Sequence, residues 1–318
     1  QVFIRGKVQD DSGVGQVLVN GKRTRVAADG AFAKKLRLAL GTNQVKVEAE
    51  DIHGNVAARD FAIVREEFIP DDTLADVDIP PRTDIRKPDA LGVVIGVESY
   101  QYVPAATYAY NDAEVVREYL AQTLGFRKDR VKLATNTRAT RAEFDRLLGR
   151  SGWLARNVVR GKSDVIVYFS GHGIPEVKSG RVGLLPFDVD PNYAIGFPLN
   201  ELYRNLGALG ARSVTVILDT CFSGQSREKK LLLADARGIV VAPRQTGLPK
   251  GVTVITAATG SQISGPLKEM EHGLFTYYLL KGLGGKADAN KDSRITVGEL
   301  ASFASREVKR HAAKLGWE

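Results

Sequence analysis

The sequence predicts a small all-β domain followed by an α/β domain with a mostly parallel sheet and helices on both faces. Short alternating runs with turn dipeptides fill residues 1–65. An acidic, proline-rich stretch follows over residues 66–90. Residues 91–318 then alternate continuous apolar runs with helical periodicity, which is typical of α/β folds. With 318 residues, 43% of them hydrophobic and 26% charged, the chain is long enough for two globular domains.

The first region alternates apolar and polar residues in short runs at positions 2–4, 16–19, 36–38, 45–47 and 61–63. The dipeptides Asn20-Gly21, Asp29-Gly30 and Gly54-Asn55 separate these runs at hairpin spacing. The pattern predicts a small β-sandwich. It resembles bacterial immunoglobulin-like modules, but it lacks the cysteine pair of antibody domains.

Residues 66–90 lose this alternation and contain four prolines and eight acidic residues. Proline stiffens a chain and like charges extend it, so we expect a stiff, solvated linker.

The larger region opens with the continuous apolar run 91–97, as expected for a strand buried on both faces of a parallel sheet. Further strands are predicted at 165–169, 214–218 and 252–256. Helices are predicted at 112–124, 141–158, 199–209, 273–283 and 296–315.

Composition excludes several classes of protein. No apolar run approaches eighteen residues, so no membrane span is expected. The net charge of +8 is unevenly distributed, but the basic residues are scattered rather than clustered with aromatic residues, and we expect no nucleic-acid binding. The one cysteine, Cys221, excludes an internal disulfide and a zinc site of several thiolates.

Two predicted strands end in residues suited to covalent chemistry. One leads into His172 and Gly173, and the other leads into Cys221. If the strands are neighbours, both side chains lie at the carboxyl edge of the sheet, where an imidazole can activate a thiol. The N–H groups of Gly173 and Cys221 could then stabilise an oxyanion. The alternative is that Cys221 is a small buried hydrophobic residue.

These segments, Ser170-Gly171-His172-Gly173 and Asp219-Thr220-Cys221-Phe222-Ser223-Gly224, resemble those of caspase-like peptidases. His172 and Cys221 are 49 residues apart (221 minus 172), close to the family spacing. The resemblance covers residue 91 to the C-terminus. It implies a caspase-like α/β sandwich, a cysteine endopeptidase with a Cys-His dyad, and protein or peptide substrates.

Within that family, Asp219-Thr220-Cys221 is similar to the metacaspases and bacterial orthocaspases. The resemblance implies that Asp112, Ser170 and Asp219 form an acidic S1 pocket for arginine or lysine. Phe222 stands where many metacaspases have histidine. Alternatively, Asp112 is a favourable residue at a helix N-terminus, and Asp219 merely orients a turn.

Residues 288–299 have the spacing of a calcium-binding loop, with Asp288, Asn290, Asp292, Arg294 and Glu299 at ligand positions. Ser293 replaces the expected glycine. Thr296 and Glu299 equally form a capping box for the last helix. Calcium is therefore possible, and no cofactor is required for the chemistry.

The connection 225–251 is long for a compact α/β domain and carries six cationic residues. In family members this segment is cleaved on activation, so Lys229, Lys230 and Arg237 are candidate sites of self-processing. A plain surface loop is the alternative.

A catalytically silent caspase homologue, acting as a scaffold through its β-sandwich, is the competing function. The sequence starts at Gln1 rather than methionine, which suggests a trimmed or processed chain. The immunoglobulin-like module favours an extracytoplasmic (periplasmic or secreted) location. The oligomeric state is not predicted.

Overall fold

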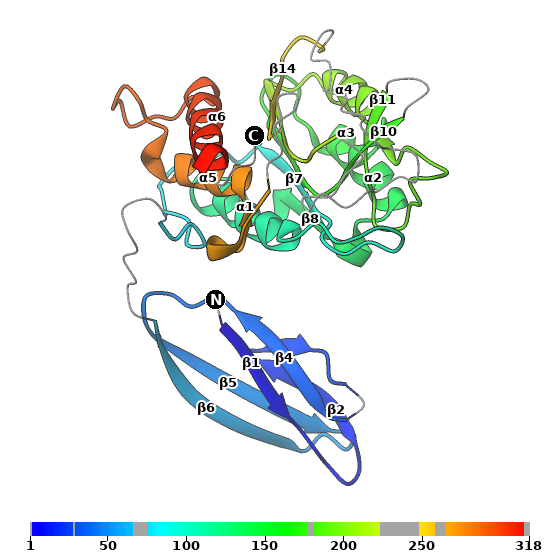
Figure 1. Cartoon of the computed structure of the whole chain (residues 1–318), viewed down its shortest axis with the longest axis vertical. Coiled ribbons are helices and arrows are strands. Elements are labelled where there is room, and N and C mark those ends of the chain that lie inside the picture. Colours follow the sequence, from blue (N-terminus) through cyan, green and yellow to red (C-terminus); the bar gives the residue numbers. More distant parts are fainter. Residues whose placement is uncertain are drawn as a thin grey trace. The chain divides into compact units, whose positions relative to one another are not determined.

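A computed structural model describes residues 2–27, 29–65, 75–176, 181–222, 248–257 and 265–314 of the chain (Figure 1). The chain divides into two compact units, Gln1–Ile79 and Pro80–Glu318.

The first unit is all-β, which confirms the predicted class of the N-terminal domain. Strands β1 and β4 pair in one antiparallel sheet, and the second antiparallel sheet has the order β3-β2-β5-β6. Buried apolar side chains of both sheets form its core. The described strands are β1 (Val2–Lys7), β2 (Val14–Val19), β3 (Lys22–Thr24), β4 (Ala31–Leu36), β5 (Gly41–Asp51) and β6 (Val56–Arg65).

The hairpin between β2 and β3 turns at Asn20 and Gly21, which have φ angles of 49° and 70°. Two successive positive φ angles are what an Asn-Gly turn requires, so this predicted turn is confirmed. Strand β3 escaped prediction because three residues are too few to show a period. The run predicted at 36–38 was misplaced, because the strand there ends at Leu36.

The second half of the expected linker is bound to the second unit. Thr83 donates its backbone N–H to the Gln122 carbonyl oxygen at 3.1 Å, and Lys87 donates to Gly125 at 2.9 Å. The hydroxyl of Thr123 donates to the Pro81 carbonyl oxygen at 2.6 Å. These residues therefore follow the end of helix α1 (Ala109–Gln122). Residues 66–74 lie outside the described part.

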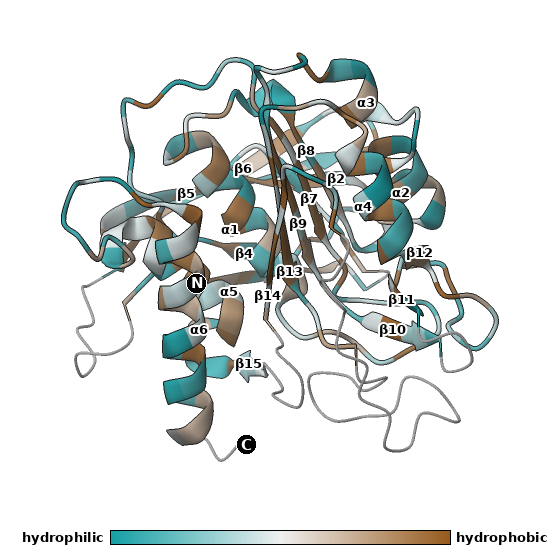
Figure 2. Cartoon of the chain, turned by 90° about the horizontal axis from the view of Figure 1, so that it is seen from above, coloured by the Kyte–Doolittle hydropathy of each residue, from teal (hydrophilic) through white to brown (hydrophobic). Residues whose placement is uncertain are grey.

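The second unit is built on a five-stranded parallel sheet of order β14-β13-β9-β7-β8. Helices α1, α5 and α6 cover one face and helices α2, α3 and α4 cover the other (Figure 2), which confirms the predicted α/β fold. All six residues of β7 are buried, as expected for a central strand. The strands are β7 (Leu91–Gly96), β8 (Val131–Thr135), β9 (Asp164–Ser170), β13 (Ser213–Asp219) and β14 (Val252–Thr256).

Two predictions for this unit were wrong. Strand β8 was missed because it is a short edge strand in which Val131 and Ala134 alone are fully buried. The single helix predicted over 141–158 is two helices, because Gly149 has an extended backbone (φ −62°, ψ 164°) that ends the first one. The helices of this unit besides α1 are α2 (Arg141–Leu148), α3 (Trp153–Asn157), α4 (Leu199–Gly207), α5 (Leu274–Lys281) and α6 (Val297–Lys314).

Short strands follow the carboxyl ends of the main sheet. They form one antiparallel sheet of order β10-β11-β12 and a separate pair, β15 and β16. In the described parts of the chain, no helix combines the length and apolarity needed to cross a membrane. The short strands are β10 (Gly173–Glu176), β11 (Arg181–Leu184), β12 (Phe197–Pro198), β15 (Pro266–Leu267) and β16 (His272–Gly273).

Candidate active site

Strands β9 and β13 are adjacent and parallel, and they end side by side. Ser170 and Asp219 are paired in the register, and the Gly171 N–H donates to the Asp219 carbonyl oxygen at 3.3 Å. The segments that continue to His172 and Cys221 therefore leave the sheet at the same edge. The predicted site depends on these two strands being neighbours, and the sheet topology shows that they are.

The His172 ring is held in a fixed orientation and is 2% exposed. It stacks on the Tyr100 ring with centroids 4.8 Å apart, and the His172 backbone N–H donates to the Tyr100 hydroxyl at 2.7 Å. Its Nε2 lies 2.8 Å from the Pro104 carbonyl oxygen. A carbonyl oxygen can only accept, so this contact assigns the proton of the neutral ring to Nε2 and leaves Nδ1 as the basic nitrogen.

Cys221 is half-buried in the segment that packs against Gly173. A Cβ atom added to Gly173 would lie 2.8 Å from the Cys221 carbonyl oxygen and 2.5 Å from the Phe222 ring. Glycine is therefore required for the two segments to touch. Phe222 is buried in the core cluster, so its side chain serves packing.

The three residues expected in the S1 pocket adjoin one another at this edge. Asp112, in the first turn of α1, accepts a hydrogen bond at 2.9 Å from the Ser170 hydroxyl, and Asp219 is the sheet neighbour of Ser170. The exposed fractions of Asp112, Ser170 and Asp219 are 0%, 0% and 1%. Asp112 also satisfies the alternative interpretation, because its charge lies at the positive end of the helix.

Three further residues, which were not predicted to be part of the acidic pocket, bind these carboxylates. His272 Nδ1 lies 2.9 Å from Asp112 Oδ1, and the Gly273 N–H donates to the same oxygen at 3.1 Å. Thr276 in α5 donates its hydroxyl to Asp219 at 2.5 Å and its N–H at 3.2 Å. The two carboxylates are thus held at the sheet edge by groups from β16 and α5.

A family model for the caspase domain matches residues 90–315, which is well over half of the chain. The chain belongs to the caspase family. The recognition made from the two motifs is confirmed at this level. A model for domain B of glucodextranase matches residues 1–66, in agreement with an all-β module there.

No curated protein matches the chain. Among solved structures, the caspase-family chain is similar to protein GSU0716 from Geobacter sulfurreducens, with 17% sequence identity. That similarity covers 70% of this chain and 89% of the other, with a TM-score of 0.46.

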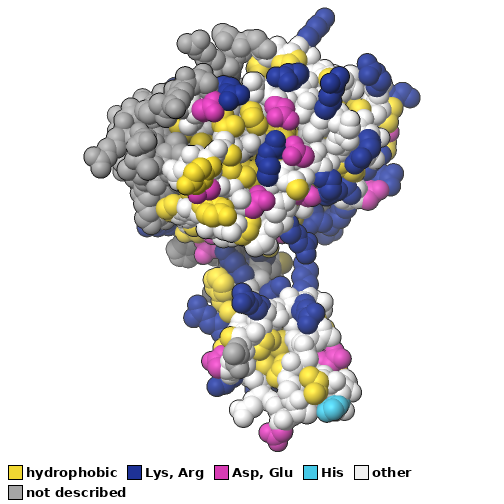
Figure 3. Space-filling view, turned by 90° about the vertical axis from the view of Figure 1, so that its right-hand side faces the viewer, with side chains coloured by type: hydrophobic (Ala, Val, Ile, Leu, Met, Phe, Trp, Pro, Cys, Tyr) yellow, Lys and Arg dark blue, Asp and Glu magenta, His cyan; other side chains and the backbone are white. Residues whose placement is uncertain are grey.

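Figure 3 shows one face on which lysine and arginine side chains are spread among acidic and hydrophobic ones.

The expected calcium loop adopts the capping-box arrangement. The Thr296 N–H and hydroxyl donate to Glu299 Oε2 at 2.9 and 2.8 Å, and the Glu299 N–H donates back at 3.2 Å. Asp288 accepts backbone N–H groups of Asp292 and Ser293 within the loop. In the described ranges, no group of three or more His, Cys, Asp or Glu side chains is arranged to hold a metal. Calcium binding stays a prediction.

The candidate self-processing residues lie outside the part of the chain that the structure describes. They are Lys229, Lys230 and Arg237.

Proposed function

We propose that the caspase domain is a cysteine endopeptidase that cleaves after arginine or lysine, with Cys221 as nucleophile and His172 as its base. The observation that carries the proposal is the joint arrangement at one sheet edge. The His172 ring is oriented by the Pro104 carbonyl, the next residue, Gly173, packs against the cysteine segment, and two buried carboxyl groups lie at the ends of the neighbouring elements.

In the proposed reaction, His172 Nδ1 removes the Cys221 thiol proton, and the thiolate attacks the carbonyl carbon of the scissile bond. The N–H groups of Gly173 and Cys221 stabilise the oxyanion. The imidazolium gives its proton to the leaving amine as the C–N bond breaks, and a thioester remains. Water deprotonated by His172 then hydrolyses the thioester and releases the thiol.

The Pro104 carbonyl contributes to each of these steps by accepting from Nε2–H. It keeps the basic nitrogen in one orientation and stabilises the imidazolium, as an acceptor behind a catalytic histidine does in hydrolases.

A basic P1 preference is supported by charge. Asp112 and Asp219 accept hydrogen bonds from hydroxyl and N–H donors, which orient a carboxylate. A lysine or arginine side chain entering beside them would be attracted, and an aspartate would be repelled.

Positional peptide libraries cleaved by the purified chain test the proposal. We expect cleavage after arginine and lysine, none after aspartate, and covalent labelling of Cys221 by a thiol probe. A labelled but inactive protein would favour the silent scaffold. Equal cleavage after aspartate would refute the acidic pocket.

Three further elements of the proposal concern processing, calcium and location. Self-processing in the 225–251 segment would yield fragments ending at Lys229, Lys230 or Arg237 in the wild type and not in Cys221→Ala. Calcium, if bound, would use the loop from Asp288 to Glu299. An extracytoplasmic location is proposed from the immunoglobulin-like module.

A further inference from the structure

A buried histidine contacts Asp112 from a different strand than Ser170 does. His272 lies in β16, which pairs with β15, and its side chain is 1% exposed. Its Nδ1 is 2.9 Å from Asp112 Oδ1, and the next residue, Gly273, donates its N–H to both carboxylate oxygens at 3.1 and 3.3 Å. Two consecutive residues of one short strand thus bind one carboxylate.

Asp112 is therefore held from two elements. Ser170 in β9 donates to Oδ2 at 2.9 Å, while His272 and Gly273 in β16 donate to Oδ1. Because a carboxylate rotates about its χ2 angle unless both oxygens are engaged, donors on the two oxygens restrict it to one orientation. Asp219 has a comparable anchor in Thr276.

We propose that His272 is a positioning residue for substrate specificity, which fixes the Asp112 carboxylate in the orientation that meets a cationic P1 side chain. The inference rests on the proposed function and adds to it a residue outside the family motifs quoted for this sequence. His272 acts through Asp112 and does not itself contact the substrate.

Substitutions at position 272 separate the donor from the bulk of the ring. Asparagine carries a donor nitrogen at the same number of bonds from Cα as Nδ1, so His272→Asn can keep the hydrogen bond to Asp112. Leucine fills a similar volume without a donor, so His272→Leu removes the imidazole contact with Oδ1 and keeps the hydrogen bond from the Gly273 N–H.

The test compares two peptides that differ only at P1, one with arginine and one with citrulline, its uncharged analogue. For His272→Leu in the full chain, we expect the arginine-to-citrulline ratio of kcat/KM to fall about 10- to 100-fold, mainly through KM. For His272→Asn, we expect the ratio to stay within about threefold of the wild type.

His311→Leu is the matched control, because His311 in α6 makes a comparable contact with the Tyr278 hydroxyl at 2.9 Å, away from the pocket. It should leave the ratio unchanged. The rate of Cys221 alkylation by iodoacetamide should be the same in all variants, which shows that the nucleophile is intact.

Each other outcome overturns the inference. An equal fall for both peptides in His272→Leu would mean that His272 is purely structural, and a rise in the ratio would mean that it competes with the substrate. If His272→Leu does not fold, His272→Ser, too short to reach Asp112, replaces it. A wild type that cleaves the two peptides equally would instead refute the basic P1 preference itself.

Discussion

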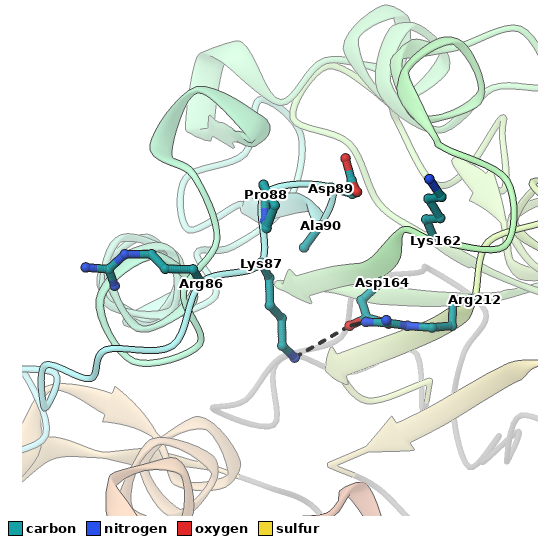
Figure 4. A pocket seen from close by; sticks show the side chains of 8 residues that line it. All are labelled: Arg86, Lys87, Pro88, Asp89, Ala90, Lys162, Asp164 and Arg212. Atoms are coloured by element: carbon teal, nitrogen blue, oxygen red, sulfur yellow. Dashed lines mark hydrogen bonds and ion pairs between the residues drawn. The ribbon is translucent and has the colours of Figure 1, made fainter.

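The two ends of the central sheet both hold carboxylates, but in opposite environments. At the carboxyl end, Asp112 and Asp219 are buried and bound by hydroxyl, imidazole and backbone donors. At the amino end, Asp164 is the first residue of β9 and lines a cavity of about 130 Å³. The side chains of Arg212 and Lys87 point toward Asp164, and that of Arg86 points away from it (Figure 4).

The negative charge of Asp164 is balanced by the positive charges of Arg212 and Lys87. Arg212 Nε donates to it at 2.9 Å, the Ser213 hydroxyl at 2.7 Å, and Lys87 Nζ is 3.6 Å away. The hydrogen bond from Arg212 is the main cause that lowers the pKa of Asp164 from 3.8 to about 2. At the amino end opposite charges pair in contact with solvent, whereas at the carboxyl end the two carboxyl groups are buried and held by hydrogen bonds. Function is expected at the buried end.

The largest expected difference between the two ends concerns catalysis. Cys221→Ala should abolish peptide hydrolysis and His172→Ala should lower kcat/KM by about three orders of magnitude or more, because the two act as a unit. Asp164→Asn, at the opposite end, should change kcat/KM less than about twofold. Steady-state assays with a P1 arginine peptide measure all three, and activity in Cys221→Ala would end the assignment.

The next effect concerns the buried carboxylates. Asp219→Ala or Asp112→Ala should cost about 2–4 kcal/mol of transition-state binding for basic substrates, because the P1 cation loses its partner. The ratio of kcat/KM for arginine and citrulline peptides reports this loss. A similar loss for both peptides would point to a folding defect instead.

The ion pair at the amino end should matter less. Because the folded-state pKa of Asp164 is lowered, its stabilisation is present above about pH 4 and is lost as the pH falls toward 2. Arg212 is 58% exposed, so Arg212→Ala should lower the free energy of unfolding at pH 7 by about 0.5–1 kcal/mol. Urea titrations at pH 7 and pH 3 measure this, and an equal difference at both would contradict the assignment of the pKa.

The smallest expected effect is in the 288–299 loop. Glu299→Gln keeps an oxygen that can accept from Thr296, so the capping box and the stability should change little. If the loop binds calcium, the same change should weaken binding, because a bidentate carboxylate is lost. Calorimetry with millimolar calcium distinguishes calcium binding from a capping role alone. No binding heat in the wild type would favour the capping role.

Much of the fold and of the candidate site could be predicted, because local sequence patterns indicate the buried strands and the residues that follow them. The apolar runs of β7, β9 and β13 identify buried strands, and His172 and Cys221 follow two of them directly. Parallel strands present their carboxyl ends at one edge, so motif and topology together placed the two residues. The edge strand β8 and the break at Gly149 were missed, since neither has a distinct period.

The sequence by itself determined the β-then-α/β order of the chain, and it identified Cys221, His172, Asp112 and Asp219 as candidate site residues. Only the tertiary structure decided which groups hydrogen-bond to these candidate residues and orient them. The acceptor behind His172 is a backbone carbonyl, which every residue possesses, so no side-chain pattern marks Pro104. His272 reaches Asp112 across 160 residues. Such a contact depends on the path of intervening loops and the packing of β16 on α1, which local periodicity does not encode.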